Sequence, residues 1–164
     1  MGSSVCSQLL SEGEAVRGLV LAGDPAAKRL PAGVEVLVGD VTDKVSLERF
    51  FTTAKKREVY VIHCASLITV AKGYSAKVQA VNVAGTQNII EACLKHRVKK
   101  LVYVSSTSAI PELPQGQMIT EVDHYDPETV IGFYGKTKAW ASQLVMDAAF
   151  REGLDASIIF PSGI

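Results

Sequence analysis

The sequence lacks an excess of charge of either sign, because 17 lysines and arginines balance 17 aspartates and glutamates. With no run of like charge, it has no basic surface of the kind that nucleic acid or an anionic membrane needs, so we expect a small-molecule partner instead. It also lacks an apolar stretch of roughly 20 residues and a basic start followed by an apolar run. These absences predict a soluble cytoplasmic protein without a nucleic-acid or membrane partner.

Cysteine is scarce as well, since only Cys6, Cys64 and Cys93 occur. Their number is odd and they show no Cys-x-x-Cys spacing, which argues against a disulfide framework or a cysteine-based metal site. Each lies among apolar neighbours, as reduced core thiols do, and a redox or metal role is the alternative interpretation. We therefore expect three reduced thiols and no bound metal.

The sequence does contain an alternation of extended and helical patterns over 164 residues, enough for one packed core and short for two. Apolar residues recur at helical spacing, and short runs are rich in β-branched residues. The expected helices span 3–12, 43–54, 76–96 and 127–152, and the expected strands span 15–23, 34–40, 59–66, 100–106 and 155–161. This order predicts a single α/β domain, 1–164, with a doubly wound parallel sheet covered by helices on both faces.

Residues that follow the expected strands are small, polar or conformationally restricted, and ligands of such folds bind beyond the carboxyl ends of the strands. These residues are Asp40, Ala65, Ser66, Ser105, Ser106, Pro161, Ser162 and Gly163. They suit a groove lined by backbone groups that takes an extended cofactor. Glycine, serine and aspartate also end strands simply because they favour turns and helix caps, so both interpretations stay open at this point.

The stretch FYGKTKAW, 133–140, places Tyr134 four residues before Lys138 within an expected helix. Side chains at this spacing lie on the same helix face, where the ammonium favours the phenolate form of the tyrosine. A tyrosine with a lowered pKa suits an acid or base that acts on an alcohol or a carbonyl, and the Ser106 hydroxyl can bind the same oxygen. The pair alone also fits an ordinary solvated helix face.

The context of this pair resembles a known family. VYVSSTSA (102–109), YGKTKAWASQLVMDA (134–148) and FPSGI (160–164) resemble the extended short-chain dehydrogenase/reductases, the NAD-dependent epimerase/dehydratase group. GDVTD (39–43), VIHCAS (61–66) and VNVAGTQNIIEAC (81–93) resemble further segments of that family in the same order. The likeness is greatest to the dihydroflavonol-reductase-like branch. It implies a Rossmann-like fold and NAD(P)-dependent hydride transfer on a sugar nucleotide or a ketone/alcohol substrate.

The resemblance also implies a role for individual residues. Tyr134 is the expected general acid/base, Lys138 lowers its pKa and binds the nicotinamide ribose, and Ser106 binds the substrate oxygen, with Ser105 as the alternative. Expected cofactor contacts are Asp40 and Val41 at the adenine, Cys64, Ala65 and Ser66 along the cofactor, Asn82 in the middle of the groove, and Pro161, Ser162 and Gly163 at the nicotinamide. A helix-leading role for Asp40 and a buried, satisfied amide for Asn82 are the alternatives.

Two departures from the family concern the ends of the chain. The family begins with a strand and a glycine-rich turn that holds the cofactor pyrophosphate, and MGSSVCSQLL reads as the helix after that turn. The alternative is that Met-Gly-Ser-Ser is a leader from an expression vector. We interpret the chain as an internal fragment that lacks the first strand and the substrate region. We therefore expect two unpaired strand edges, weak dinucleotide binding and no activity.

The sequence gives partial information on the type of cofactor and on the oligomeric state. The end of the expected strand 15–23, with LVLAGD at 19–24, lacks an arginine for a 2′-phosphate, so the sequence favours NAD over NADP. A homodimer is left open. The alternative function is a dinucleotide-binding regulator or pseudoenzyme of the same fold, because a fold alone does not fix an activity. An intact serine, tyrosine and lysine set favours the enzyme.

Overall fold

The computed structural model describes residues 1–52, 58–71 and 73–162. Its strands are parallel and form two sheets, one of two strands and one of three in the order β3-β4-β5. The strands are β1 (Arg17–Val20), β2 (Glu35–Val38), β3 (Tyr60–His63), β4 (Lys100–Val104) and β5 (Ala156–Ile159). Each lies inside a predicted extended segment, so the predicted parallel α/β fold is confirmed.

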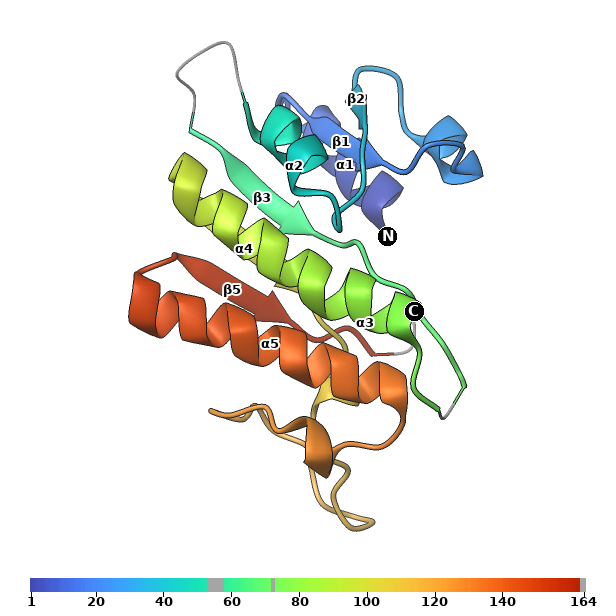
Figure 1. Ribbon diagram of the computed structural model, residues 1–164, viewed down its shortest axis with the longest axis vertical. Coiled ribbons are helices and arrows are strands. Elements are labelled where there is room, and N and C mark those ends of the chain that lie inside the picture. The colour runs from blue at the N-terminus through green and yellow to red at the C-terminus, as the bar shows by residue number, and fades with distance from the viewer. Residues whose placement is uncertain (53–57, 72, 163–164) are drawn as a thin grey trace.

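Helices alternate with the strands along the chain. They are α1 (Gly2–Ser11), α2 (Lys44–Phe51), α3 (Ala76–Gln79), α4 (Gly85–His96) and α5 (Phe133–Glu152), and the short helices are η1 (Pro25–Arg29), the π-helical η2 (Ala80–Ala84), η3 (Thr107–Ala109) and η4 (Pro127–Thr129). In the view of Figure 1, α4 and α5 lie in front of the three-stranded sheet and α1 lies behind β1. No helix in the described part of the chain is long and apolar enough to span a membrane.

The prediction of one helix over 127–152 is wrong at its start. η4 ends at Thr129, and α5 begins only at Phe133. Between them Gly132 has φ 79°, a left-handed conformation that glycine adopts without steric cost and that interrupts a helix. As a result Tyr134 lies in the first turn of α5, close to the loops that surround the site.

The main core lies between the three-stranded sheet and helices α2, α4 and α5. Leu47, Ile90, Leu101 and Val145 are among its most deeply buried side chains. Burying such a side chain contributes about 1.5–3 kcal/mol through the hydrophobic effect. A smaller cluster around Ala139, which includes Ile110, Tyr125 and Val130, holds the segment between β4 and α5 against α5. These contacts fix α5 with respect to β4.

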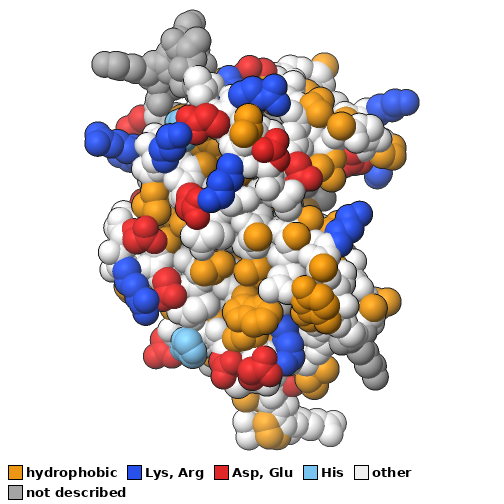
Figure 2. Space-filling model, in the orientation of Figure 1, with side chains coloured by type: hydrophobic (Ala, Val, Ile, Leu, Met, Phe, Trp, Pro, Cys, Tyr) orange, Lys and Arg blue, Asp and Glu red, His pale blue; other side chains and the backbone are white. Residues whose placement is uncertain are grey.

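The two sheets are not joined by a strand in the described residues, since β1 pairs with β2 and β3 pairs with β4. Within this part of the chain one edge of β1 and one edge of β3 are therefore unpaired, as expected. On β3 the side chains of Tyr60 and Ile62 are exposed, while Val61 and His63, which point to the other face, are buried. Two of the four side chains of β3 are thus exposed to solvent, although parallel strands usually have both faces covered. Figure 2 shows further apolar side chains at the surface of the molecule.

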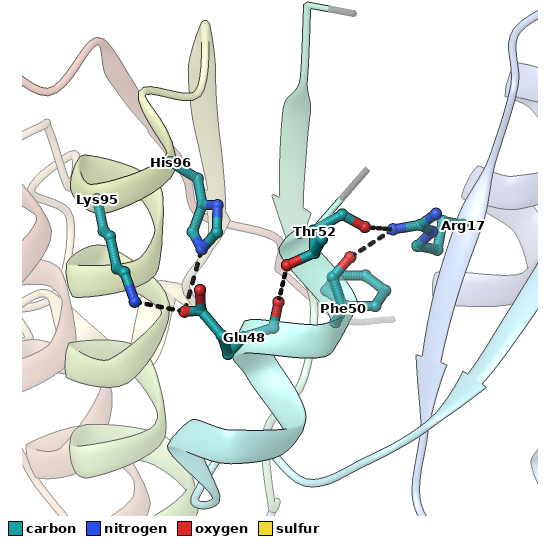
Figure 3. A network of polar contacts seen from close by, with 6 residues as sticks. All are labelled: Arg17, Glu48, Phe50, Thr52, Lys95 and His96. Atoms are coloured by element: carbon teal, nitrogen blue, oxygen red, sulfur yellow. Dashed lines mark hydrogen bonds and ion pairs between the residues drawn. The ribbon is translucent and has the colours of Figure 1, made fainter. Parts of the chain in front are cut away.

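Helix α2 connects the two sheets through polar contacts (Figure 3). From β1, the Arg17 guanidinium donates to the carbonyl oxygens of Phe50 at 2.7 Å and Thr52 at 2.9 Å, at the end of α2 where carbonyls lack helical partners. The same guanidinium forms a two-pronged ion pair with Glu35 on β2, both contacts being 3.0 Å long. Arg17 therefore ties the two-stranded sheet to α2.

On its other side α2 is tied to α4. The Glu48 carboxylate accepts from Lys95 Nζ at 2.8 Å and lies 3.2 Å from His96 Nε2 (Figure 3). These two hydrogen bonds lower the pKa of the Glu48 carboxyl, with Lys95 as the larger cause. The contact between the two halves of the fold thus combines the apolar side chains under α2 with exposed ion pairs.

Candidate active site

The side chain of Lys138 is buried in the fold, with 1% of its surface exposed. Its Nζ donates to the carbonyl oxygen of Val104, the last residue of β4, at 2.8 Å. Within the described chain no carboxylate pairs with it. Burial lowers the pKa of this ammonium from 10.5 to about 8, with the nearby Cys64 opposing the shift. Lys138 is therefore a charge held beneath the carboxyl end of the sheet, with N–H groups that have no acceptor among the described residues.

Tyr134 lies one helical turn before Lys138 on α5 and is partly exposed. Its backbone carbonyl accepts from the Thr137 hydroxyl at 2.8 Å. Its phenolic hydroxyl makes no hydrogen bond to any residue that the structure describes, so it is free to bind a ligand. A phenol one helical turn from a buried ammonium can act as an acid or a base on a bound ligand.

The two serines after β4 differ in accessibility. Ser105 is buried and its hydroxyl lies 2.7 Å from that of Ser142 on α5. Ser106 is partly exposed and caps η3, because its oxygen accepts from the Ser108 N–H at 3.2 Å. The Ser106 hydroxyl proton has no acceptor among residues 1–52, 58–71 and 73–162, so it can be donated to a ligand. The geometry thus favours Ser106, the first choice from sequence, over Ser105 as the group that meets a substrate oxygen.

A close approach brings the Ser106 segment to α5. A Cβ added at Gly135 would lie 2.6 Å from the carbonyl oxygen of Ser108, closer than real Cβ atoms come to any heavy atom. Only glycine at this position allows α5 and η3 to touch in this way. Gly135, next to Tyr134, therefore sets the distance between the tyrosine and the serine loop.

Asn82 joins the loop after β3 to α5. Its side-chain oxygen accepts from the Leu67 N–H at 2.7 Å and the Ser66 hydroxyl at 3.1 Å, and its amide donates to the Leu67 carbonyl and the Thr137 hydroxyl, both at 3.0 Å. It is 1% exposed and its hydrogen-bonding capacity is used within the protein. This geometry fits the satisfied buried amide, while a direct cofactor contact stays a prediction.

The expected adenine contacts lie at the end of β2. The Asp40 carboxylate accepts from the Thr42 N–H at 2.8 Å and so forms a local turn. Val41 is buried, and its carbonyl accepts from Asn88 of α4 at 3.0 Å. A Cβ on Gly85 would come within 2.7 Å of the Val41 side chain, so this glycine lets the helix approach. The segment after β2 is thus in contact with α4 through Val41.

The remaining expected contacts lie beyond β3 and β5. Cys64 is partly buried, and burial raises the pKa of its thiol. Ala65 is exposed, which leaves its backbone accessible. The Pro161 carbonyl accepts from the Thr107 N–H at 3.3 Å, which places the segment after β5 beside η3, and Ser162 is exposed. Gly163 lies outside the described residues.

Sequence reasoning missed the buried polar side chains under the site. His63 and Tyr103 are cross-strand partners on β3 and β4, and both are buried. Thr86, Thr137 and Ser142 contribute buried hydroxyls from α4 and α5. Part of this could have been found from the sequence, because a polar residue at a core position of an apolar helix or strand needs a hydrogen-bond partner inside the fold.

Comparisons with known proteins agree with this fold. A structure titled UDP-glucose 4-epimerase complex with NAD, from Thermus thermophilus, superposes with a TM-score of 0.81 at 27% identity, over 97% of this chain and 50% of that one. Short-chain dehydrogenase/reductase family 42E member 1 of Mus musculus is 34% identical over 84% of this chain and 37% of its own. A Synechocystis protein whose name refers to dihydroflavonol 4-reductase is 30% identical over 99% of this chain and 46% of its own.

The chain therefore spans about half the length, or less, of these relatives. Their names and folds confirm the predicted short-chain dehydrogenase/reductase resemblance, its dihydroflavonol-reductase-like branch and its NAD(P)-dependent class. A family profile matches residues 1–157, which include every strand described above except the last two residues of β5. The chain belongs to the 3-beta hydroxysteroid dehydrogenase/isomerase family.

Proposed function

We propose that the protein to which this chain belongs is an NAD(P)-dependent oxidoreductase or epimerase that interconverts an alcohol and a carbonyl. One observation carries the proposal: Lys138 is buried without a carboxylate partner in the described chain, one helical turn from the partly exposed Tyr134. A buried lysine is costly, and an unpaired one is rarer still, so such residues concentrate at functional sites. A purely structural lysine would be paired or exposed.

The residues around Lys138 and Tyr134 suit a dinucleotide at the carboxyl ends of the strands. Ala65 and Ser162 leave an open, small-residue surface there, and the free N–H groups of Lys138 can donate to ribose hydroxyls. When bound, the nicotinamide supplies or accepts the hydride. NAD is favoured over NADP, because the segment LVLAGD at the end of β1 has no arginine for a 2′-phosphate. Asp24 in this segment caps η1 by accepting from the Ala26 N–H.

The proton follows a separate route in the proposed reaction. In the reductive direction Tyr134 gives its phenolic proton to the carbonyl oxygen as hydride adds to the carbonyl carbon, and the product is the alcohol. The phenolate left on Tyr134 is stabilised by the Lys138 ammonium. Ser106, whose hydroxyl proton has no acceptor in the described chain, donates a hydrogen bond to the same oxygen. Oxidation runs through these steps in reverse.

An apolar substrate is favoured over a sugar nucleotide by exposed apolar side chains in the loop after β3 and in the segment that leads into α5. Ile68 and Val70, in the loop after β3, and Ile131, before α5, are highly exposed. Tyr74 is also exposed and packs edge-on against Phe133 with ring centroids 5.3 Å apart. Exposed apolar side chains gathered next to a site mark it for an apolar ligand. The names of the dihydroflavonol and hydroxysteroid relatives agree with a ring ketone or alcohol.

Turnover of the full-length protein tests the proposal. Ketone and alcohol panels, with NADH, NADPH or their oxidised forms, are followed at the nicotinamide absorbance. Tyr134→Phe should abolish turnover and leave cofactor affinity nearly unchanged, because it removes only the transferable proton. Tyr60→Phe, on an exposed tyrosine of β3, is the matched control and should keep wild-type rates. Turnover by Tyr134→Phe contradicts the assignment, and dinucleotide binding without any turnover supports the regulator instead.

A further inference from the structure

Tyr103 lies at the centre of the three-stranded sheet, directly under the candidate site. It is 1% exposed, and its hydroxyl is the one buried side-chain polar atom in the described chain without a partner at hydrogen-bonding geometry, although the side chains of Thr86 and Ser105 lie close to it. An unpartnered buried hydroxyl is unfavourable compared with a phenyl group of the same shape. Hydrogen bonding of the hydroxyl therefore does not explain why this side chain is buried here. The contacts of the aromatic ring are the remaining explanation.

The face of the Tyr103 ring carries the ammonium of Lys138. Lys138 Nζ lies 4.4 Å from the ring centroid, within the range of a cation–π interaction, which strengthens when the cation is desolvated. Together with the Val104 carbonyl, the ring is what the described structure places against this charge. A carboxylate would also keep the ammonium protonated, but its negative charge would offset the positive charge at the site and it would accept from the remaining N–H groups. An aromatic face keeps it positive and leaves its remaining N–H groups for the site.

His63 fixes the Tyr103 ring from the neighbouring strand. The two rings are 5.5 Å apart between centroids and tilted by 34°. His63 Nε2 lies 3.0 Å from the Thr86 hydroxyl, which already donates its proton to the Asn82 carbonyl at 2.7 Å. Nε2 must therefore carry the proton in this hydrogen bond. Burial, and then the charge of Lys138, lower the pKa of His63 to about 3, so it is neutral and adds no competing charge.

We propose that Tyr103 is a positioning residue that holds the Lys138 ammonium at the end of β4 and keeps it charged through the face of its ring. The titratable groups that face Lys138 are His63 and Cys64 from the β3 side and Tyr103 on β4, and Tyr134, one turn earlier on α5, lies near Tyr103. Its catalytic meaning rests on the proposed function. The charge state of Lys138 can be measured without any turnover, so the two proposals fail separately.

The test varies the π-electron density of the ring at constant shape. Tyr103→Phe is the reference, since it keeps the ring and removes the unpartnered hydroxyl. Phenylalanine analogues with one, three and five ring fluorines are then inserted at 103, each withdrawing more charge from the ring face. The pKa of Lys138 is read from ¹⁵N-labelled lysine side chains by NMR titration, with the signal assigned by its loss in Lys138→Arg. Thermal unfolding of each variant controls for packing.

We expect Tyr103→Phe to leave the pKa of Lys138 near that of the wild type. The pKa should then fall stepwise along the fluorine series, by about one unit at five fluorines, which is a tenfold loss of proton affinity. In the active full-length protein the alkaline limb of kcat/KM should shift down by the same amount. A pKa that stays constant or rises along the series, at unchanged melting temperature, overturns the proposal. If the fluorinated chains do not fold, Tyr103→Met, which fills the space without a π face, must show the same fall.

Discussion

Replacing Gly135 by alanine tests the close contact between α5 and η3 on which the site geometry depends. The added Cβ would lie 2.6 Å from the Ser108 carbonyl oxygen, whereas ordinary contacts begin at 3.4 Å, so the helix or the loop must move. Forcing extra atoms into a packed contact costs about 1–3 kcal/mol. Alanine regains about 1 kcal/mol of helix propensity over glycine. We expect a net loss of about 1 kcal/mol, or about 2–4 °C in Tm.

Circular dichroism melts of Gly135→Ala measure this loss. Gly2→Ala is the matched control, because Gly2 is also helical and a Cβ there meets nothing within 4 Å. It should be neutral or slightly stabilising. In the active protein, Gly135→Ala should also lower kcat/KM at least tenfold, since a displacement of about 1 Å at a reacting group is enough for such a loss. A Gly135→Ala protein that is more stable than the wild type would refute the close approach.

Further predictions concern the groups around this contact. Asn82→Leu should lower the free energy of unfolding by about 2–4 kcal/mol in urea titrations, because it leaves several buried partners unsatisfied; an unchanged midpoint would contradict its linking role. In the folded protein the pKa of His63 is lowered from 6.5 to about 3, so between these pH values the imidazole is protonated in the unfolded state and neutral in the folded state. The free energy of unfolding should therefore fall as the pH drops from about 6.5 to about 3. His63→Gln should flatten that pH dependence, whereas exposed His124→Gln should not. The full-length protein should bind NAD at least as tightly as NADP by tryptophan fluorescence; a clear NADP preference would point to Lys28 or Arg29 of η1 as the phosphate partner.

The strands could be read from the sequence because their β-branched runs are short and bounded by turn residues, and the Tyr134–Lys138 spacing placed both residues correctly on one helix. The choice between Ser105 and Ser106 was also within reach. Alternation along β4 puts Leu101 and Tyr103 on one face, and Ser105, directly after the strand, continues that buried face, so alternation alone places Ser106 on the opposite side.

Other features needed the fold. Lysine is rarely buried, and nothing near position 138 shows that its partner is a carbonyl 34 residues earlier on β4. The wide π turn at Ala80–Ala84 has no sequence signature that separates it from an α-helix, yet it carries Asn82 into contact with both Leu67 and Thr137. The close approach at Gly135 depends on Ser108, a residue of a distant turn.

The absence of a strand between β1 and β3 means that the two halves of the described chain do not share a backbone hydrogen-bond ladder. No residue of α1 or β1 is buried, whereas β4 is largely enclosed. The coupling between the halves is therefore carried by side chains, with Arg17 and Glu48 prominent among them. Regions with few buried contacts open locally at low free-energy cost. The amide hydrogens of β1 and β2 should then exchange with solvent through sub-global opening. The amide hydrogens of β4 should exchange only when the whole three-stranded sheet unfolds.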